Sequence, residues 1–267
     1  MYFKINATKI VLSMCMTLFC SVNAQTKDVK ISRTQLWVMG ELKIALMQHW
    51  GFVIQEGSRY DLSYQKDVNG KITDERPEKY WLQELWAGPF YKGDFKDKLS
   101  YSVNLIYQPQ LWYPDETKSL FYLRNTVCSA FNLNMKIKRN ISFQYRLITW
   151  ALFKADQGKN QKIDNEFIIR NMFGVTYAFC GKLKASFSEE IFLKPTADEK
   201  DLDGTECFYQ NAIWTGVSYL PNENVSISLK YVPFYTNMTN SQLNKTAVYD
   251  HYFFMEFSKL LKFKMKK

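Results

Sequence analysis

Long stretches of this chain alternate between apolar and polar residues with a period of two. Residues 141–153, ISFQYRLITWALF, show this most clearly, because Ile141, Phe143 and Tyr145 share one side and polar residues lie between them. Successive side chains of a β-strand point to opposite faces, so the pattern predicts a strand with one apolar and one mixed face. An average globular strand has about five or six residues, whereas a tilted strand that crosses a bilayer needs roughly nine to eleven.

The same alternation recurs after a short polar lead. It predicts strands at 35–46, 52–64, 80–91, 99–111, 121–137, 141–153, 167–179, 183–193, 209–219, 225–235 and 252–263. The connections between them alternate between short turns and longer polar segments, as in up-and-down barrels of bacterial outer membranes. Aromatic residues near the predicted strand ends are candidates for girdles at the membrane interfaces: Trp37, Trp50, Trp81, Trp112, Trp150, Tyr219 and Tyr235.

Alternation alone does not separate a membrane barrel from a soluble sandwich, since both need one apolar and one polar face. The length of the segments, their aromatic and aliphatic faces, and the mixed charges opposite favour a barrel around a wet interior. In lipid every backbone polar group must be paired, so an all-strand protein must close on itself. We therefore predict an all-β fold, a single up-and-down antiparallel transmembrane β-barrel of ten to twelve strands, with Phe143, Phe173 and Phe257 facing outward. Twelve is favoured because bacterial barrels normally have an even number, and residues 29–33 are a candidate for the extra strand.

The amino-acid composition argues against a transmembrane helix and against a nucleic-acid partner. Tyr 17, Phe 20 and Trp 7 make the chain 16% aromatic, and the sequence after the N-terminal region holds no run of eighteen apolar residues that would predict a transmembrane helix. The formal net charge is +9, but the basic residues are scattered and no nucleic-acid motif is present, which argues against a nucleic-acid partner. The three cysteines beyond the N-terminal region have no close spacing and are expected to be free thiols: Cys128, Cys180 and Cys207. The alternative is that two of them form one disulfide in an oxidising compartment.

The N-terminus has the features of an export signal. Lys4 and Lys9 precede the apolar stretch 10–19, and Val22 and Ala24 are suitable residues before a cleavage point. This pattern predicts a secretory signal peptide over 1–24 that is removed after Ala24. The barrel domain is then expected over 25–267.

Several stretches resemble a known family. They are 208–231, which reads FYQNAIWTGVSYLPNENVSISLKY, together with 250–254, 35–37 and 188–191. This pattern is similar to a family of small bacterial outer-membrane β-barrels known only as a domain of unknown function. The resemblance covers most of the mature chain. It implies a barrel in the outer membrane of a Gram-negative bacterium and brings no catalytic residues with it.

Candidate catalytic and metal-binding residues are few. A barrel hydrolase would need a histidine beside a serine nucleophile, but the position two residues after His251 is Phe253, and His49 falls in a predicted turn. No His/Cys cluster has metal-ligand spacing, and the acidic run 198–204 lacks the terminal glutamate of an EF-hand loop. We therefore predict no catalytic residues, no metal and no cofactor.

Charged residues on the predicted inward faces are the most informative set. They are Glu41, Lys43, Glu84, Arg124, Lys136, Arg146, Glu166, Arg170, Lys184, Glu190, Lys230 and Glu256. Inside a barrel such groups must be hydrated or paired. Two interpretations are open: a salt-bridged plug that stiffens the wall, or a narrow polar pore whose excess of Arg and Lys selects small anions.

The sequence therefore predicts a non-enzymatic outer-membrane barrel. It would be a narrow or plugged pore for small polar or anionic solutes, or a structural protein of the envelope, surrounded by outer-membrane lipid and lipopolysaccharide. Two alternatives remain: a barrel-embedded lipid-modifying hydrolase that uses His251, and a secreted soluble β-barrel that binds a ligand.

Overall fold

The computed structural model describes residues 29–68, 71–73, 81–96, 98–113, 122–154, 166–194, 208–239 and 245–262. The predicted signal peptide, the acidic run 198–204 and Cys207 lie outside these residues. Within the described ranges every regular element is a β-strand. No helix in them is long and apolar enough to span a membrane.

Twelve strands make up one sheet, and they include all eleven segments predicted from the alternation. They are β1 (Val29–Ala45), β2 (Trp50–Val68), β3 (Lys71–Thr73), β4 (Trp81–Lys96), β5 (Leu99–Tyr113), β6 (Tyr122–Lys138), β7 (Ile141–Lys154), β8 (Glu166–Ala178), β9 (Leu183–Leu193), β10 (Phe208–Asn222), β11 (Val225–Thr239) and β12 (Lys245–Lys262). Several strands run further than the sequence indicates, because their polar tips continue to pair after the apolar alternation has ended. Residues 29–33 are not an extra strand, since they form the start of β1.

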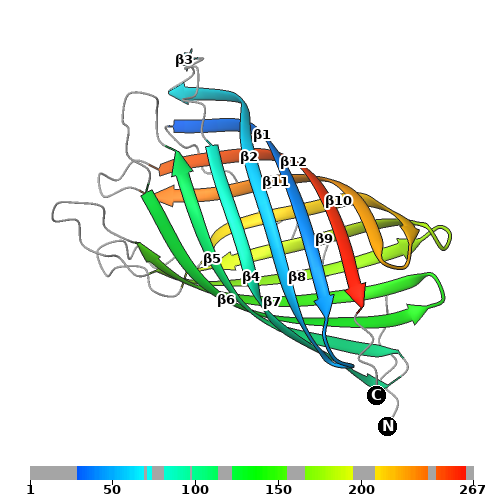
Figure 1. Ribbon diagram of the computed structural model, residues 1–267. Helices are drawn as coiled ribbons and strands as arrows, with labels where there is room; N and C mark the ends of the chain where they lie inside the picture. The colour runs from blue at the N-terminus through cyan, green and yellow to red at the C-terminus, as the bar shows by residue number, and fades with distance from the viewer. Residues whose placement is uncertain are drawn as a thin grey trace, which may run out of the picture.

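Eleven of the twelve strands close into a barrel (Figure 1). Each wall strand pairs antiparallel with the next along the chain, and the short β3 pairs only with the end of β2. The wall closes because β1 also pairs with β12, from Val29 opposite Thr246 to Ala45 opposite Lys262. The predicted up-and-down barrel is confirmed, with eleven strands in its wall and the short β3 outside it.

The closing pair is parallel, in contrast to every other pair in the wall. An up-and-down meander with an odd number of strands has its first and last strands running in the same direction, so its closure can only be parallel. A closed wall leaves no unpaired edge, which a membrane requires. β1 and β12 both end at the right of Figure 1, where short turns join successive strands, and we call this the short-turn end.

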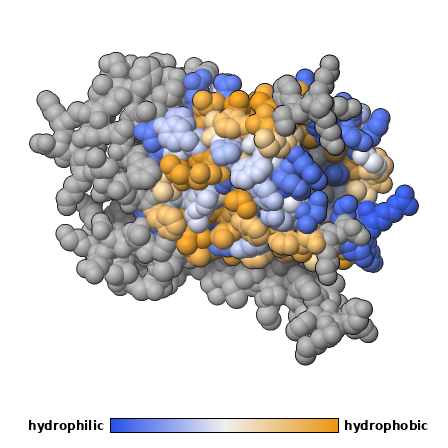
Figure 2. Space-filling model, turned by 60° about the horizontal axis from the view of Figure 1, so that its bottom comes forward, coloured by the Kyte–Doolittle hydropathy of each residue, from blue (hydrophilic) through white to orange (hydrophobic). Residues whose placement is uncertain are grey.

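The apolar side chains face outward, as predicted. Along β8, Phe167, Phe173 and Val175 are exposed, whereas Ile168 and Arg170 between them are buried. Phe143 pairs with Val175 on this outer face. Figure 2 shows hydrophobic side chains across the visible outer wall, with hydrophilic ones gathered toward its right-hand end. The exposed fraction of Phe257 is 45%, so the third phenylalanine also faces outward.

Aromatic rings gather on the outer wall near the short-turn end. The ring centroid of Tyr91 lies 5.0 Å from that of Trp50 and 6.0 Å from that of Tyr101, which stacks on Phe95 at 4.5 Å. Rings with one polar edge suit the boundary between hydrocarbon and water.

Trp37 and Trp150 do not belong to such a girdle, contrary to the expectation from sequence. Trp37 is buried inside the barrel, and Trp150 packs against the inner apolar clusters. Both occupy inward-facing positions of their strands. The prediction rests only on how near they lie to the predicted strand ends, which does not show the face to which a side chain points. The side chains of Trp81 and Trp112 lie outside the described part of the structure.

Polar groups on the outer wall pair with one another across neighbouring strands. The Tyr145 hydroxyl donates to the Asn171 side-chain oxygen at 3.0 Å, and the Asn211 amide donates to a Glu189 carboxylate oxygen at 3.2 Å. Hydrocarbon offers no hydrogen bonds, so polar groups at this depth are stabilised by having a partner within the wall.

The parallel closure predicts a specific pattern of cross-links. In a background without native cysteines, Leu36→Cys with Phe253→Cys and, separately, Leu42→Cys with Lys259→Cys should form disulfides on oxidation, because each pair lies directly opposite in the parallel register. The exchanged pairs, Leu36 with Lys259 and Leu42 with Phe253, should not. Mobility on a non-reducing gel measures this. An antiparallel closure could link only one of the two direct pairs, and that result would refute the register.

Candidate functional site

A buried carboxylate, Glu84, organises the first of two polar clusters inside the barrel. Arg59 Nη2 on β2 donates to Glu84 Oε1 at 2.9 Å, and Trp86 Nε1 donates to Glu84 Oε2 at 3.1 Å. The Arg59 guanidinium carbon also lies 3.8 Å from the ring centroid of Trp37 on β1. The carboxylate is thus neutralised by one cation, and that cation is stacked on a second indole.

A second cluster repeats this arrangement with residues of β7 to β10. Arg170 Nε and Nη2 donate to the two carboxylate oxygens of Glu190 at 2.8 and 2.9 Å, and Trp214 Nε1 donates to Glu190 Oε2 at 3.0 Å. The Arg170 guanidinium lies 4.2 Å from the ring centroid of Trp150. Each cluster therefore contains an arginine, a glutamate, a tryptophan that donates to the glutamate and a tryptophan beneath the arginine.

Both carboxylates are buried, so their stability depends on these contacts. Glu84 and Glu190 are each only 1% exposed. An ionised carboxylate removed from water is strongly disfavoured unless it is paired and hydrogen-bonded. Both carboxylates accept from an arginine and a tryptophan, and Glu84 also accepts from Gln110 Nε2 at 3.2 Å. An indole face attracts a cation, so the tryptophans stabilise the guanidinium groups as well as filling space.

Ring contacts join the two clusters. Trp86 lies 6.3 Å from Trp150, and Phe254 lies 4.8 Å from Trp37 and 5.8 Å from Trp214, between ring centroids. Together with the hydrogen bonds and stacking contacts above, they form a closed ring of contacts between residues of eight wall strands. We call this set the belt; its residues are Trp37, Arg59, Glu84, Trp86, Trp150, Arg170, Glu190, Trp214 and Phe254.

Apolar side chains fill the space around the belt. They form three clusters of buried residues: Leu152, Ile168, Phe192, Ala212, Val232, Phe234 and Tyr252; Val53, Trp86, Phe90, Ile106 and Cys128; and Trp37, Met39 and Phe254. These side chains are almost completely covered, and seven of them, all from the second and third clusters, also border the cavity described next. The expectation of a wet interior is therefore wrong for the middle of the lumen, because many inward positions there carry aromatic or branched residues.

Toward the short-turn end the lumen opens into a cavity of about 470 Å³, which we call the vestibule. Trp37, Trp86, Arg170, Trp214 and Phe254 of the belt form its floor. Its wall is largely polar, with Glu41, Lys43, Gln55, Lys92, Ser102, Asn104, Asn132, Arg146, Lys230 and Glu256.

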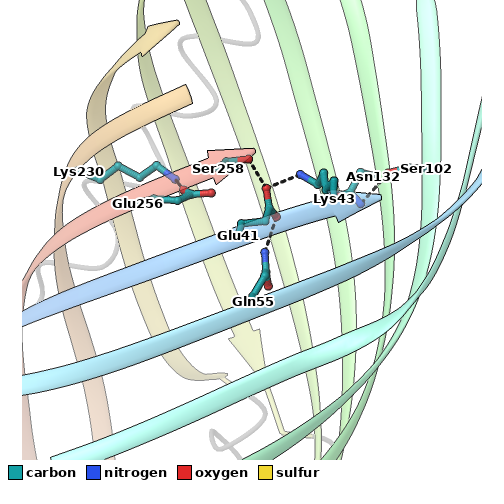
Figure 3. A network of polar contacts seen from close by, with 8 residues as sticks. All are labelled: Glu41, Lys43, Gln55, Ser102, Asn132, Lys230, Glu256 and Ser258. Carbon is teal, nitrogen blue, oxygen red and sulfur yellow. Dashed lines mark hydrogen bonds and ion pairs between the residues drawn. The ribbon is translucent and has the colours of Figure 1, made fainter. Parts of the chain in front are cut away.

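Most charged groups in the vestibule are paired (Figure 3). Glu41 Oε1 accepts from Lys43 Nζ and from Ser258 Oγ, both at 2.7 Å, and its other oxygen accepts from Gln55. On the neighbouring strands, Lys230 Nζ donates to a Glu256 carboxylate oxygen at 2.7 Å.

Arg146 differs from the other cations of the vestibule. Its Nε has no hydrogen-bond partner, and no ion pair is found for it among the described residues. On β7, Arg146 lies opposite Asn132 of β6 and Met172 of β8. Met172 is the next inward-facing residue of β8 after Arg170. Since Arg170 is held by Glu190, Arg146 has no carboxylate in direct contact among the described residues.

The structure places ten of the twelve predicted charged residues. Glu84 and Glu190 lie in the belt, and Lys136 and Lys184 sit on β6 and β9 near the short-turn end. The residues that line the vestibule are Glu41, Lys43, Arg146, Arg170, Lys230 and Glu256. The side chains of Arg124 and Glu166 lie outside the described part.

Sequence reasoning missed several inward residues. Arg59 could have been found by continuing the parity of Val53 and Gln55 along β2. Arg33 makes a two-bond ion pair with Asp250, with both distances 2.7 Å. It was missed because the last strand was expected to begin after Asp250, whereas β12 begins at Lys245.

The candidate catalytic groups are not assembled. His49 Nδ1 lies 3.0 Å from the Lys92 carbonyl oxygen, and His251 Nδ1 lies 2.7 Å from the hydroxyl of Tyr231 on the outer wall. In the part of the chain that is described, no three His, Cys, Asp or Glu side chains are grouped to hold a metal ion. Cys128 and Cys180 are free thiols, as expected.

Comparisons with known proteins add little. No protein-family model matches this chain, and no curated protein sequence matches it. Three chains among the solved structures match it in fold, and one of them is a NanC porin. That porin is 11% identical, with a TM-score of 0.42 over 84% of this chain and 99% of its own. A likeness of this size carries no argument about function.

The belt predicts a strong and correctable effect of one substitution. Arg170→Met should destabilise the barrel by about 3–5 kcal/mol, because it leaves Glu190 buried without a cation. Adding Glu190→Gln should recover more than half of this loss, since the amide oxygen still accepts from Trp214. Guanidinium unfolding in detergent, followed by tryptophan fluorescence, measures both variants.

Lys43→Met is the matched control for this experiment. Lys43 is also ion-paired, but its side chain is 45% exposed and Glu41 keeps two other donors. The expected cost is about 1 kcal/mol or less. Equal losses for Arg170→Met and Lys43→Met, or no recovery in the double variant, would contradict the role given to the belt.

Proposed function

We propose that this chain is a non-enzymatic outer-membrane β-barrel whose lumen is blocked at its middle and open as a vestibule on one side. The observation that carries the proposal is the burial of the belt, in which Glu84 and Glu190 are almost inaccessible to water. Of the two interpretations that the sequence leaves open, this geometry favours the plug. The plug consists of aromatic rings as much as of ion pairs.

Three features of the wall support a location in lipid. The outward faces are apolar, aromatic rings gather on the outer wall near the short-turn end, and outward polar groups such as Glu189 and Asn211 pair with each other. In bacterial barrels the short turns lie on the periplasmic side, so the vestibule would open toward the periplasm. Outer-membrane lipid and lipopolysaccharide of a Gram-negative bacterium would then surround the wall.

The two alternative functions receive less support. A secreted soluble barrel would be expected to present hydrophilic side chains to water, but large apolar residues such as Leu105, Leu229 and Phe253 are about half exposed on the outer wall. A lipid hydrolase would need a nucleophile next to His251, and the contact of that histidine is the Tyr231 hydroxyl.

Conductance across a planar lipid bilayer tests the blocked lumen. The purified wild-type barrel should show no steady open channel. The double variant Trp86→Ala with Trp150→Ala should conduct, because these two rings are in contact inside the lumen and their removal opens space between the clusters. Trp50→Ala, which removes a ring of similar size from the outer wall, is the control and should remain closed.

The protein for these recordings should first be shown to be folded by its heat-dependent migration on a gel. A steady ohmic conductance of the wild-type protein would refute the blocked lumen. Persistent closure of the folded double variant would show that the two tryptophans are not part of the block.

A further inference from the structure

We propose that the vestibule binds a small organic anion and that Arg146 is its main contact. The inference deepens the proposed function and rests on it in one respect, since the vestibule must be reachable from the side on which the barrel is open. Three features of the vestibule favour an anion there: its excess of cations, the row of donors beside Arg146 and its apolar floor.

The vestibule has more cations than carboxylates to pair them. Lys43 is paired with Glu41, Lys230 with Glu256, and Arg170 with Glu190 behind the cavity wall. The two cations left over are Arg146, deep in the cavity, and Lys92, near the mouth. Asp94 lies beside Lys92 in the outer part of the opening, so the unbalanced positive charge is concentrated at Arg146.

An unpaired guanidinium in this position is electrostatically unfavourable. Arg146 and Arg170 occupy successive inward positions across β7 and β8, so two positive charges face the same enclosed space. The Nε of Arg146 is buried and has no acceptor. By contrast, the two cations of the belt, Arg59 and Arg170, each have a carboxylate and an aromatic partner. A bound anion would supply the acceptor that Arg146 lacks and would reduce the repulsion between the two arginines.

Hydrogen-bond donors extend from Arg146 along one row of the wall. The register of β5, β6 and β7 places Ser102 opposite Asn132 and Asn132 opposite Arg146, all facing the lumen. Asn132 Nδ2 donates to Ser102 Oγ at 3.1 Å, which leaves the serine hydroxyl hydrogen and the second amide hydrogen of Asn132 available. This row can bind two oxygens of one carboxylate or phosphate group, as the planar fork of arginine does.

The floor of the vestibule determines the rest of the ligand. Trp86, Trp214 and Phe254 present aromatic surface to the cavity. The volume of about 470 Å³ lies within the roughly 300–1,000 Å³ typical of small-molecule sites. A ligand with a carboxylate or phosphate at one end and a ring or other weakly polar part at the other would satisfy both surfaces. Lys92 near the mouth would attract such anions from solution.

Binding to the folded barrel in detergent tests this inference. The probes are phenyl phosphate and benzoate, with inorganic phosphate for the anionic group alone, benzyl alcohol as the neutral analogue and benzylamine as the cationic one. Calorimetry and quenching of tryptophan fluorescence measure the affinity. Saturable binding is expected for phenyl phosphate and benzoate, weaker binding for inorganic phosphate, and none for the neutral and cationic probes.

Variants identify the site. Arg146→Gln should weaken phenyl phosphate binding by at least about tenfold, which corresponds to the loss of one charged contact. Arg146→Lys keeps the charge without the planar fork and should give a smaller loss, and it remains informative if the glutamine variant does not fold. Arg139→Gln removes a cation from the exposed turn between β6 and β7 and should leave the affinity unchanged.

The outcomes separate this inference from the proposed function. No saturable binding of any anion to the folded wild-type barrel, or unchanged affinity in both Arg146 variants, would overturn the anion site while leaving the blocked lumen intact. Conductance by the wild-type barrel would overturn the block, but it would not alter an affinity measured in detergent.

Discussion

The interior of this barrel depends on the pairing of two buried carboxylates. Glu84 and Glu190 are almost inaccessible to water, and each accepts from a guanidinium and an indole N–H at hydrogen-bond distance. Those partners come from different strands, and each guanidinium in turn requires an aromatic face. The result is a ring of contacts that joins eight strands of the wall on its lumen side. This ring divides the lumen into a dry middle and a polar vestibule, from which the proposed closure and the anion site both follow.

The outer face of the barrel depends on a different constraint, the pairing of backbone polar groups. Every backbone edge must be paired where the wall meets hydrocarbon, and this odd-stranded meander meets that demand by pairing β1 with β12 in parallel over their full length. The same constraint explains why outward polar groups occur in pairs, as with Tyr145 and Asn171. Pairing between neighbouring strands thus occurs on both faces of the wall, as in Arg170 with Glu190 inside and Tyr145 with Asn171 outside.

Much of the wall can be predicted from the sequence, because burial on one face of a strand leaves a period of two that is easy to recognise. The interior is harder to predict. Trp37 and Trp150 suit a membrane interface as well as a packed lumen, so residue type does not decide between them and only the parity of the strand does. The pair Arg170–Glu190 depends on the diagonal register of β8 and β9, which the alternation leaves free. The parallel closure has no sequence signal of its own, since it follows only from the number of strands.

The most direct test of the account is a nitroxide scan along β8 in lipid bilayers, from Phe167 to Tyr177, in a background without native cysteines. Electron paramagnetic resonance can compare collisions of each label with oxygen, which concentrates in hydrocarbon, and with a water-soluble nickel complex. The account predicts high oxygen accessibility at Phe167, Ile169, Phe173 and Val175, and low accessibility to both reagents at Ile168. High accessibility to the nickel complex at the first set would show a water-facing exterior and contradict the account.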